Sequence, residues 1–250
     1  QKRVLYVSGE ESERQIKMRA VRLNSNVGAT GPSPLPANLL LVTETNLEII
    51  LNHISEVKPE LLIIDSIQTV YLSSMDSSAG SVSQVRECSS QLRELAKTSG
   101  ISVCVIGHVT KEGMVAGPML LSHMVDTVLY LEGEALTGTR ILRSFKNRFG
   151  DTSEVGIFIM EEQGMVELKD ASTFFMNKNN QNAPGSCLAV IMEGSRPLLV
   201  EIQALTVPSV LSFPRRVATG VSEKRLELLL AVIQKHVRIP IERTDIFVNV

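Results

Sequence analysis

Short apolar runs alternate with amphipathic segments through the first hundred residues. Four of these runs are rich in Leu, Ile and Val and contain almost no polar residue, which is typical of strands buried on both faces of a sheet. The runs are residues 4–7, 39–42, 61–64 and 101–106. The pattern therefore predicts four buried strands.

Three segments between these runs place apolar residues at the spacing of one helix face. They are residues 11–23, 46–57 and 82–97. Thr45, followed three residues later by Glu48, is typical of a helix N-terminus, and Gly100 is typical of the residue that ends a helix. Alternating strands and helices predict right-handed crossovers and a mostly parallel sheet flanked by helices, an α/β fold.

The pattern changes after about residue 126, where shorter strand-like runs follow one another across short turns. These runs are residues 127–131, 140–145, 155–160 and 166–168. We expect them to extend the sheet in the antiparallel sense. The loop-like residues 112–122 come before them.

A stretch rich in Asn, Gly and Pro predicts a linker at residues 173–185. Beyond it the pattern predicts strands at 187–192 and 198–205 and a helix at 222–236. Ser222 suits the start of that helix. Its apolar stripe consists of Leu226, Leu229, Leu230 and Ile233.

The composition is that of a globular protein, with 44% hydrophobic and 21% charged residues over 250 positions. The net charge of −2 excludes a simple polycation, so any contact with nucleic acid requires a local basic patch. Residues 178–250 contain nine Lys and Arg against six Asp and Glu. This excess favours DNA contact by the second part of the chain.

The three cysteines, Cys88, Cys104 and Cys187, lie far apart and form no Cys-x-x-Cys pair. They favour a reducing compartment and argue against a disulfide framework or a zinc knuckle within this chain. No apolar run approaches the ~20 residues needed to span a bilayer. Because the chain begins in a strand-like run without Met, we expect it to be a piece of a longer protein.

Two acidic residues follow predicted strands. Asp65 ends the run 61–64, and Glu10 lies in the segment SGEES after the first run. The carboxyl ends of parallel strands form the edge where ligands of α/β folds bind. There an Asp can hold Mg²⁺ and a Glu can polarise a water that attacks a phosphate. Taken singly, each signal also has a structural alternative. Asp65 could cap the turn after its strand, and an acidic residue of SGEES could favour the N-terminus of the following helix.

Two further segments carry cations. His108 and Lys111 follow the strand predicted at 101–106 and could donate hydrogen bonds to a γ-phosphate, although a lone His is also common as a structural residue. Lys146 and Arg148 stand two apart in KNRFG, so on a strand they would share a face. They could grip one anion together or form a solvated strand edge.

Six segments occur together in the chain. They are VLYVSGEES (4–12), LLIIDSIQTVY (61–71), GSVSQVREC (80–88), VIGHVTKEG (105–113), HMVDTVLYLEGE (123–134) and LRSFKNRFG (142–150). In order and spacing they resemble the RadA (Sms) family of bacterial DNA repair proteins, of which KNRFG is the signature. Residues 184–205 and 214–235 are similar to the start of that family's Lon-protease-like domain. Plant organellar homologues share these motifs.

The resemblance implies a RecA-like ATPase that forms a hexameric ring on single-stranded DNA. It implies that the ring promotes branch migration or unwinding of branched DNA beside a recombinase of the RecA type. The compartment would be the bacterial cytoplasm, or a plastid or mitochondrion in a eukaryote. The implied cofactors are ATP and Mg²⁺. Asp65 would hold the Mg²⁺, directly or through a water molecule. The other implied site residues are Glu10 as base, His108 and Lys111 as nucleotide sensors, and Lys146 and Arg148 on the neighbouring subunit's nucleotide.

The chain departs from the family pattern at several places. It contains neither the four-cysteine Zn²⁺ motif nor the phosphate-binding Gly-x-x-x-x-Gly-Lys-Ser/Thr loop, and we expect both upstream of Gln1 in the parent protein. Met119 and Ser122 stand where the family has Arg and Glu. No Ser–Lys protease dyad can be assigned.

The expected organisation is a RecA-like core at 1–172, the linker, and the start of a truncated α+β Lon-like domain at 186–250. Two hypotheses remain open for its role. The chain is part of a DNA-dependent ATPase or helicase, or it is an ATPase-inactive module that only assembles a ring or binds DNA.

Overall fold

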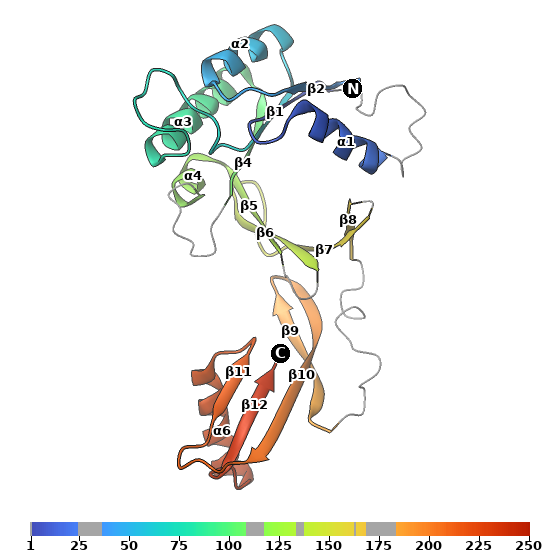
Figure 1. The fold of residues 1–250 in the computed structure, drawn as a ribbon, viewed down its shortest axis with the longest axis vertical. Coiled ribbons are helices and arrows are strands. Elements are labelled where there is room, and N and C mark those ends of the chain that lie inside the picture. Colours follow the sequence, from blue (N-terminus) through green and yellow to red (C-terminus); the bar gives the residue numbers. More distant parts are fainter. Residues whose placement is uncertain (1, 25–36, 109–117, 134–137, 163, 169–183) are drawn as a thin grey trace. The chain divides into compact units, whose positions relative to one another are not determined.

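The computed structural model describes residues 2–24, 37–108, 118–133, 138–162, 164–168 and 184–250 (Figure 1). Their contacts divide the chain into two compact units. Unit 1 consists of Gln1–Leu131, Ser144–Thr152 and Met160–Val166, and unit 2 of Glu132–Arg143, Ser153–Ile159 and Glu167–Val250. None of the described helices has the length and hydrophobicity needed to cross a membrane.

Unit 1 is built on a parallel sheet. Its strands are β1 (Val4–Ser8), β2 (Leu39–Val42), β3 (Leu61–Asp65) and β4 (Ser102–Ile106), in the order β2-β1-β3-β4. Every neighbouring pair is parallel, as predicted. Burial on both faces is wrong for the two outer strands, where Leu40 of β2 is 38% exposed and Ser102 of β4 is exposed. Both lie at the ends of the described strand order, where fewer neighbouring side chains cover the faces of a strand.

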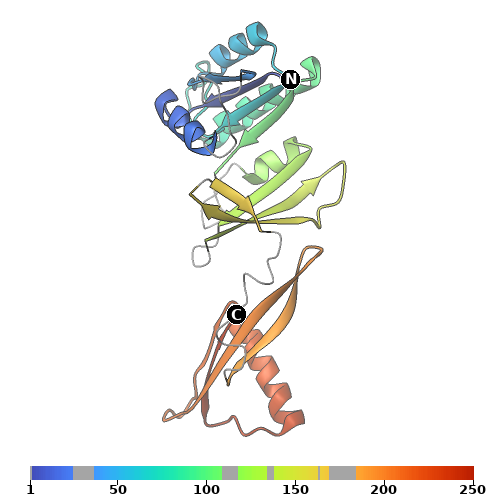
Figure 2. The same ribbon diagram turned by 90° about the vertical axis from the view of Figure 1, so that its right-hand side faces the viewer.

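Three helices flank this sheet: α1 (Glu13–Asn24), α2 (Leu47–Val57) and α3 (Val82–Ser99). The ribbon places α1 on one face and α2 with α3 on the other, as right-handed crossovers require for this strand order (Figures 1 and 2). The core between the sheet and the helices is apolar. Its fully buried members include Leu5, Leu47, Ile50, Leu62, Ile64, Val85 and Leu92.

The helix ends follow local side-chain chemistry. The spacing predicted Thr45 as the N-cap of α2, and this prediction is wrong. The N-cap is Asn46, whose side chain accepts a hydrogen bond from the backbone N–H of Glu48 at 2.9 Å. The cap therefore lies one residue later, and Glu48 comes too early in the helix for a capping box. Gly100 ends α3 with φ +72°, as predicted, because glycine adopts this left-handed conformation without steric cost.

The second set of strands is β5 (Thr127–Gly133), β6 (Thr139–Asn147), β7 (Val155–Glu161) and β8 (Gly164–Glu167). They pair in the order β5-β6-β7-β8, with β6 and β7 antiparallel, and form a sheet of their own. The helix α4 (Pro118–Met124) comes before them. The predicted loop is thus wrong from residue 118 onward, because a proline suits the first turn of a helix. Residues 112–117 lie outside the described residues.

Residues 186–250, all in unit 2, form a sheet of β9 (Ser186–Glu193), β10 (Arg196–Pro208), β11 (Arg216–Thr219) and β12 (Thr244–Asn249) with the helix α6 (Glu223–Val237). The strand order is β11-β12-β10-β9. Ser222 caps α6 as predicted. Of the predicted apolar stripe, Leu226 is buried, whereas Leu229 is 50% exposed. The pattern missed β11, and residues 173–183 of the predicted linker lie outside the described part of the chain.

Candidate active site

The turns after three parallel strands meet at one edge of the unit 1 sheet. The strand register pairs Ser8 with Asp65 and Asp65 with Ile106, so the residues that follow these positions come together. The Gly9 N–H donates to the Asp65 carbonyl at 2.8 Å. A Cβ at Gly9 would lie 1.9 Å from the Thr69 hydroxyl oxygen, so only glycine permits this close approach.

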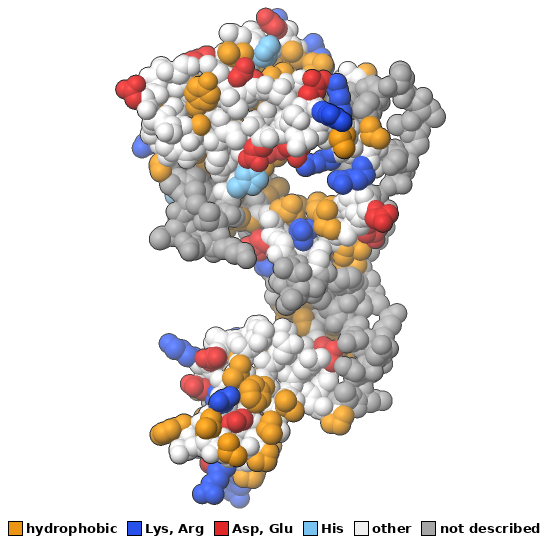
Figure 3. Space-filling view, viewed as in Figure 1, with side chains coloured by type: hydrophobic (Ala, Val, Ile, Leu, Met, Phe, Trp, Pro, Cys, Tyr) orange, Lys and Arg blue, Asp and Glu red, His pale blue; other side chains and the backbone are white. Residues whose placement is uncertain are grey.

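One oxygen of the Glu10 carboxylate has two close neighbours at this edge. Its Oε1 accepts a hydrogen bond from the Ser66 hydroxyl at 2.6 Å and lies 3.2 Å from His108 Nε2. The side chain is 43% exposed. Figure 3 shows acidic side chains gathered beside a histidine on one face of this unit. The structure thus brings together Glu10 and His108, two of the predicted site residues, and adds Ser66, which the sequence analysis did not single out.

Asp65 lies beside this group at the end of β3. The Tyr6 hydroxyl donates to Asp65 Oδ2, and no described residue makes a hydrogen bond to Oδ1. Burial, followed by the hydrogen bond to Asp65, raises the pKa of Tyr6, so the hydroxyl stays protonated and remains a donor.

The Asp65 carboxylate fits Mg²⁺ bound together with nucleotide phosphates, because such sites use one or two carboxylates, phosphate oxygens and water. No group of three or more His, Cys, Asp or Glu that could bind a metal without a nucleotide occurs among the described residues. Of the remaining predicted residues at this edge, Lys111 lies outside the described part of the chain.

Gln68 is a second residue that the sequence analysis missed. Its Nε2 donates to the backbone carbonyl of His108 at 3.1 Å. Its Oε1 is buried and has no hydrogen-bond partner among the described residues. The turn after Asp65 is therefore tied to the end of β4. The signal in the sequence was the pair of polar residues, Ser66 and Gln68, directly after a buried strand.

Lys146 interacts with the end of a helix. Its ammonium donates to the carbonyls of Ser122 at 2.7 Å and Val125 at 2.8 Å, at the C-terminus of α4. Carbonyls at the end of a helix in general lack intrahelical donors, and a cation near them is favoured by the helix dipole. In this structure Lys146 acts as a cap of α4.

Arg148 forms a more exposed pair. Strand β6 ends at Asn147, so Arg148 lies beyond the strand and is placed by its N–H, which donates to the Asp126 carbonyl at 3.1 Å. Its guanidinium Nη1 lies 2.9 Å from Asp126 Oδ1, and the two side chains are 57% and 58% exposed. Exposed pairs contribute about 0–1 kcal/mol, so this guanidinium can exchange its partner at little cost.

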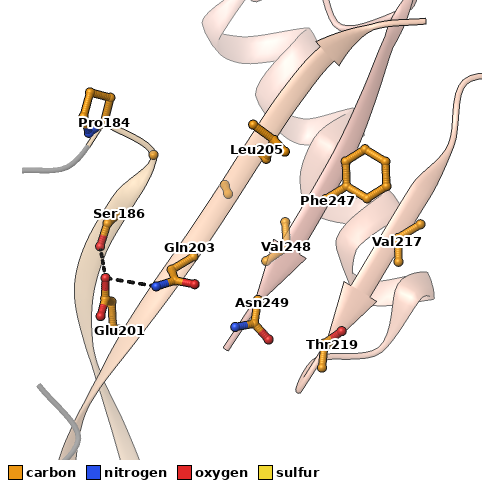
Figure 4. Close-up of a pocket in the computed structure, with 12 residues that line it drawn as sticks. Pro184, Ser186, Glu201, Gln203, Leu205, Val217, Thr219, Phe247, Val248 and Asn249 are labelled. Carbon is orange, nitrogen blue, oxygen red and sulfur yellow. Dashed lines mark hydrogen bonds between the residues drawn. The ribbon is translucent and has the colours of Figure 1, made fainter. Parts of the chain in front are cut away.

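Unit 2 contains a hollow of about 470 Å³ on its sheet (Figure 4). Glu201 Oε1 accepts hydrogen bonds there from the Ser186 hydroxyl at 2.5 Å and from Gln203 Nε2 at 3.3 Å. The lining contains no Lys, Arg or His among the described residues. A phosphate ligand would meet a carboxylate and no cation here, so this hollow is a poor candidate for a nucleotide site.

Known proteins are similar to this chain over its whole length. Residues 1–114 match the family model of an AAA domain. DNA repair protein RadA of Bacillus subtilis is 49% identical over 247 residues, which cover 99% of this chain and 52% of that protein. DNA repair protein RadA of Campylobacter jejuni subsp. jejuni is 48% identical over 249 residues, 100% of this chain and 53% of that protein. The chain spans about half the length of these curated relatives.

The fold has a counterpart among solved structures. The solved structure of another protein's ATPase domain superposes with a TM-score of 0.53 and 13% identity, over 67% of this chain and 75% of that one. At this identity the likeness concerns the fold alone. Together with the parallel sheet, its flanking helices and the antiparallel strands, it confirms the RecA-like α/β fold expected from the sequence.

Proposed function

Because this chain belongs to the RadA family of DNA repair proteins, we propose that it forms the catalytic edge of a DNA-dependent ATPase of recombinational repair. The main support is the Glu10 carboxylate, whose Oε1 accepts a hydrogen bond from Ser66 and lies 3.2 Å from His108 Nε2, beside Asp65 at the carboxyl edge of a parallel sheet. Ligands of open α/β folds bind at this edge.

The side chains of this edge divide the chemistry between them. Asp65 holds Mg²⁺, directly or through water, and the ion neutralises phosphate charge when ATP is bound. Glu10 orients the attacking water and accepts its proton. His108 and Lys111 donate hydrogen bonds to the γ-phosphate, which takes its negative charge with it when it leaves as inorganic phosphate.

Lys146 and Arg148 act on the nucleotide of the neighbouring subunit in a hexameric ring. An arginine supplied in this way is worth about 10³–10⁵ in rate. Arg148 has only to leave an exposed pair with Asp126, whereas Lys146 has to leave two carbonyls at the end of α4, those of Ser122 and Val125. We therefore assign the larger part of the catalytic effect to Arg148.

The substrate DNA is single-stranded or branched, and the ring drives branch migration together with a RecA-type recombinase. Residues 112–122 face the DNA, with a contribution from the net positive residues 178–250.

Residues 186–250 form part of a Lon-protease-like domain. Zn²⁺ belongs to the motif expected elsewhere in the parent protein, which acts in the bacterial cytoplasm. Binding through phosphate contacts weakens steeply with salt.

A second function is favoured by one observation: these 250 residues contain no Gly-x-x-x-x-Gly-Lys-Ser/Thr loop. The chain by itself would then be an ATPase-inactive module that assembles a ring or binds DNA.

The catalytic assignment is tested in a full-length protein that contains this chain. We expect Glu10→Gln to lower DNA-stimulated ATP hydrolysis by about 10²–10⁴-fold, because the amide cannot accept a proton, while ATP binding persists. Phosphate release with single-stranded DNA measures turnover. Glu11→Gln is the matched control, because Glu11 pairs with Arg19 on the surface, and it should keep near-normal turnover. Full turnover by Glu10→Gln would show that the catalytic site does not lie at this edge of the sheet.

A further inference from the structure

Glu10 has a buried partner that no expected role explains. We propose that Ser66 is a positioning residue, which orients the Glu10 carboxylate for its reaction with water. This inference rests on the proposed function of Glu10 and adds a residue on which the rate depends. Ser66 would act through Glu10 and would itself touch neither the water nor the nucleotide.

Ser66 is well placed to fix an orientation. Its side chain is 0% exposed, and its hydroxyl donates to Glu10 Oε1 at 2.6 Å. The Ser66 carbonyl accepts hydrogen bonds from the N–H of Thr69 at 3.2 Å and from the Thr69 hydroxyl at 2.8 Å. The next residue, Ile67, donates its N–H to the Ile106 carbonyl of β4 at 2.9 Å. The donor is thus held by the turn on one side and by the sheet on the other.

The second neighbour of Glu10 Oε1 differs in character. His108 Nε2 lies 3.2 Å from the same oxygen, and its side chain is 61% exposed. A buried hydrogen bond to a charged group is screened less by water than an exposed one. Ser66 therefore provides the lasting constraint on Glu10, and His108 provides one that is easily exchanged for a phosphate.

The arrangement also decides which carboxylate oxygen reacts. Ser66 and His108 both contact Oε1, and among the described residues none makes a hydrogen bond to Oε2. Oε2 is therefore the oxygen that accepts the proton of the attacking water. Holding a base in one orientation lowers the barrier, because the orientation is fixed before the reaction begins.

The test compares two hydroxyl deletions in the same turn, in a full-length protein that contains this chain. Ser66→Ala removes the donor to Glu10. Thr69→Val removes a hydroxyl that donates to the Ser66 carbonyl and leaves the Glu10 contact in place. With single-stranded DNA present, we expect Ser66→Ala to lower kcat about 10- to 100-fold, the effect of losing one hydrogen bond to a charged group. The KM for ATP should change by less than about twofold, and Thr69→Val should keep kcat within about threefold.

The outcomes separate this inference from the function on which it rests. An unchanged kcat in Ser66→Ala, with Glu10→Gln inactive, overturns the role of Ser66 alone. Equal losses in Ser66→Ala and Thr69→Val overturn it too, since the turn as a whole would then be responsible. An active Glu10→Gln overturns the proposed function. If melting curves show that Ser66→Ala does not fold, Ser66→Cys replaces it, because a thiol fills the space of the hydroxyl, although it is somewhat larger, and donates only weakly. A normal kcat in Ser66→Cys contradicts the proposal.

Discussion

Buried polar side chains in unit 1 determine how its loops are held. Gln84 of α3 is 0% exposed, and its amide binds the backbone on both sides of a loop. Its Oε1 accepts from the Leu72 N–H at 3.0 Å, and its Nε2 donates to the carbonyls of Leu72 at 3.1 Å and Ser77 at 2.9 Å. One side chain thus fixes the segment between β3 and α3, as Ser66 fixes the carboxylate at the site.

Gln84→Leu should lower the free energy of unfolding by about 2–4 kcal/mol, because one N–H and two carbonyls lose their partner in a buried place. Urea unfolding measures the loss. Gln91→Leu, on the same helix and without a described hydrogen bond, should change stability by less than about 0.5 kcal/mol. Equal effects of the two substitutions would show that the Gln84 network contributes nothing specific.

Among the elements, α2 and α4 show how helix ends depend on neighbouring side chains. Glu44 Oε1 accepts the N–H of Asn46 at 2.9 Å and that of Thr45 at 2.7 Å, just before α2 begins. These backbone donors, that of Asn46 first, lower the pKa of Glu44. The carboxylate thereby fixes the turn in which Asn46 caps the helix.

This lowered pKa gives α2 a pH-dependent contribution to stability. A carboxyl group with a depressed pKa in the folded state contributes fully above its ordinary value near 4.5, and the contribution is lost as the pH falls through the folded value. The wild type should therefore melt above Glu44→Gln at pH 7, and the difference should shrink below pH ~4.5. Glu94→Gln, on the exposed side of α3, is the control. A difference that stays constant with pH would contradict the assignment.

At the other helix, Lys146 links the KNRFG segment to the end of α4. Removing its ammonium would leave two helix carbonyls without this donor, whatever happens at a neighbouring nucleotide. Arg148 lacks this second role, because its pair with Asp126 is exposed. Arg148 is therefore the cleaner position at which to examine action between subunits.

On the scale of the whole molecule, the two units differ in the size of their apolar cores. Unit 1 buries a large core, whereas unit 2 buries a smaller one and leaves large apolar side chains exposed on its sheet and on α6, among them Val190 at 64% and Leu228 at 67% (Figure 3). Unit 1 also contains the carboxylate edge of the proposed site, but the phosphate-binding loop expected for such a site occurs nowhere in the 250 residues.

We therefore expect the 250-residue chain alone to release no phosphate from ATP, with or without single-stranded DNA. Catalysis of phosphoryl transfer depends on groups that position the phosphates, and the backbone cradle and Lys of that loop supply most of this positioning. A phosphate-release assay measures this turnover, with the full-length protein assayed in parallel for comparison. DNA-stimulated turnover by the chain alone would refute the expectation and assign the phosphate contacts to other residues.

The sequence by itself determined the parallel strands β1 to β4, the helices α1 to α3, and the edge where the candidate site lies. Leu62 and Ile64 of β3, or Val85 and Leu92 of α3, have a periodicity that reports which side faces a core, and this property is local. It failed at Thr45, where the choice between adjacent polar residues depends on cap geometry, and at the short β11, which contains too few residues for a period.

Only the tertiary structure decided which side chains meet. Ser66 reaches Glu10 across 56 positions, and Lys146 reaches Ser122 across 24. No periodicity specifies such pairs, because they result from strand order and register, which bring distant turns to one edge. The sequence shows the chemistry of each residue, but it does not show which residue is its partner.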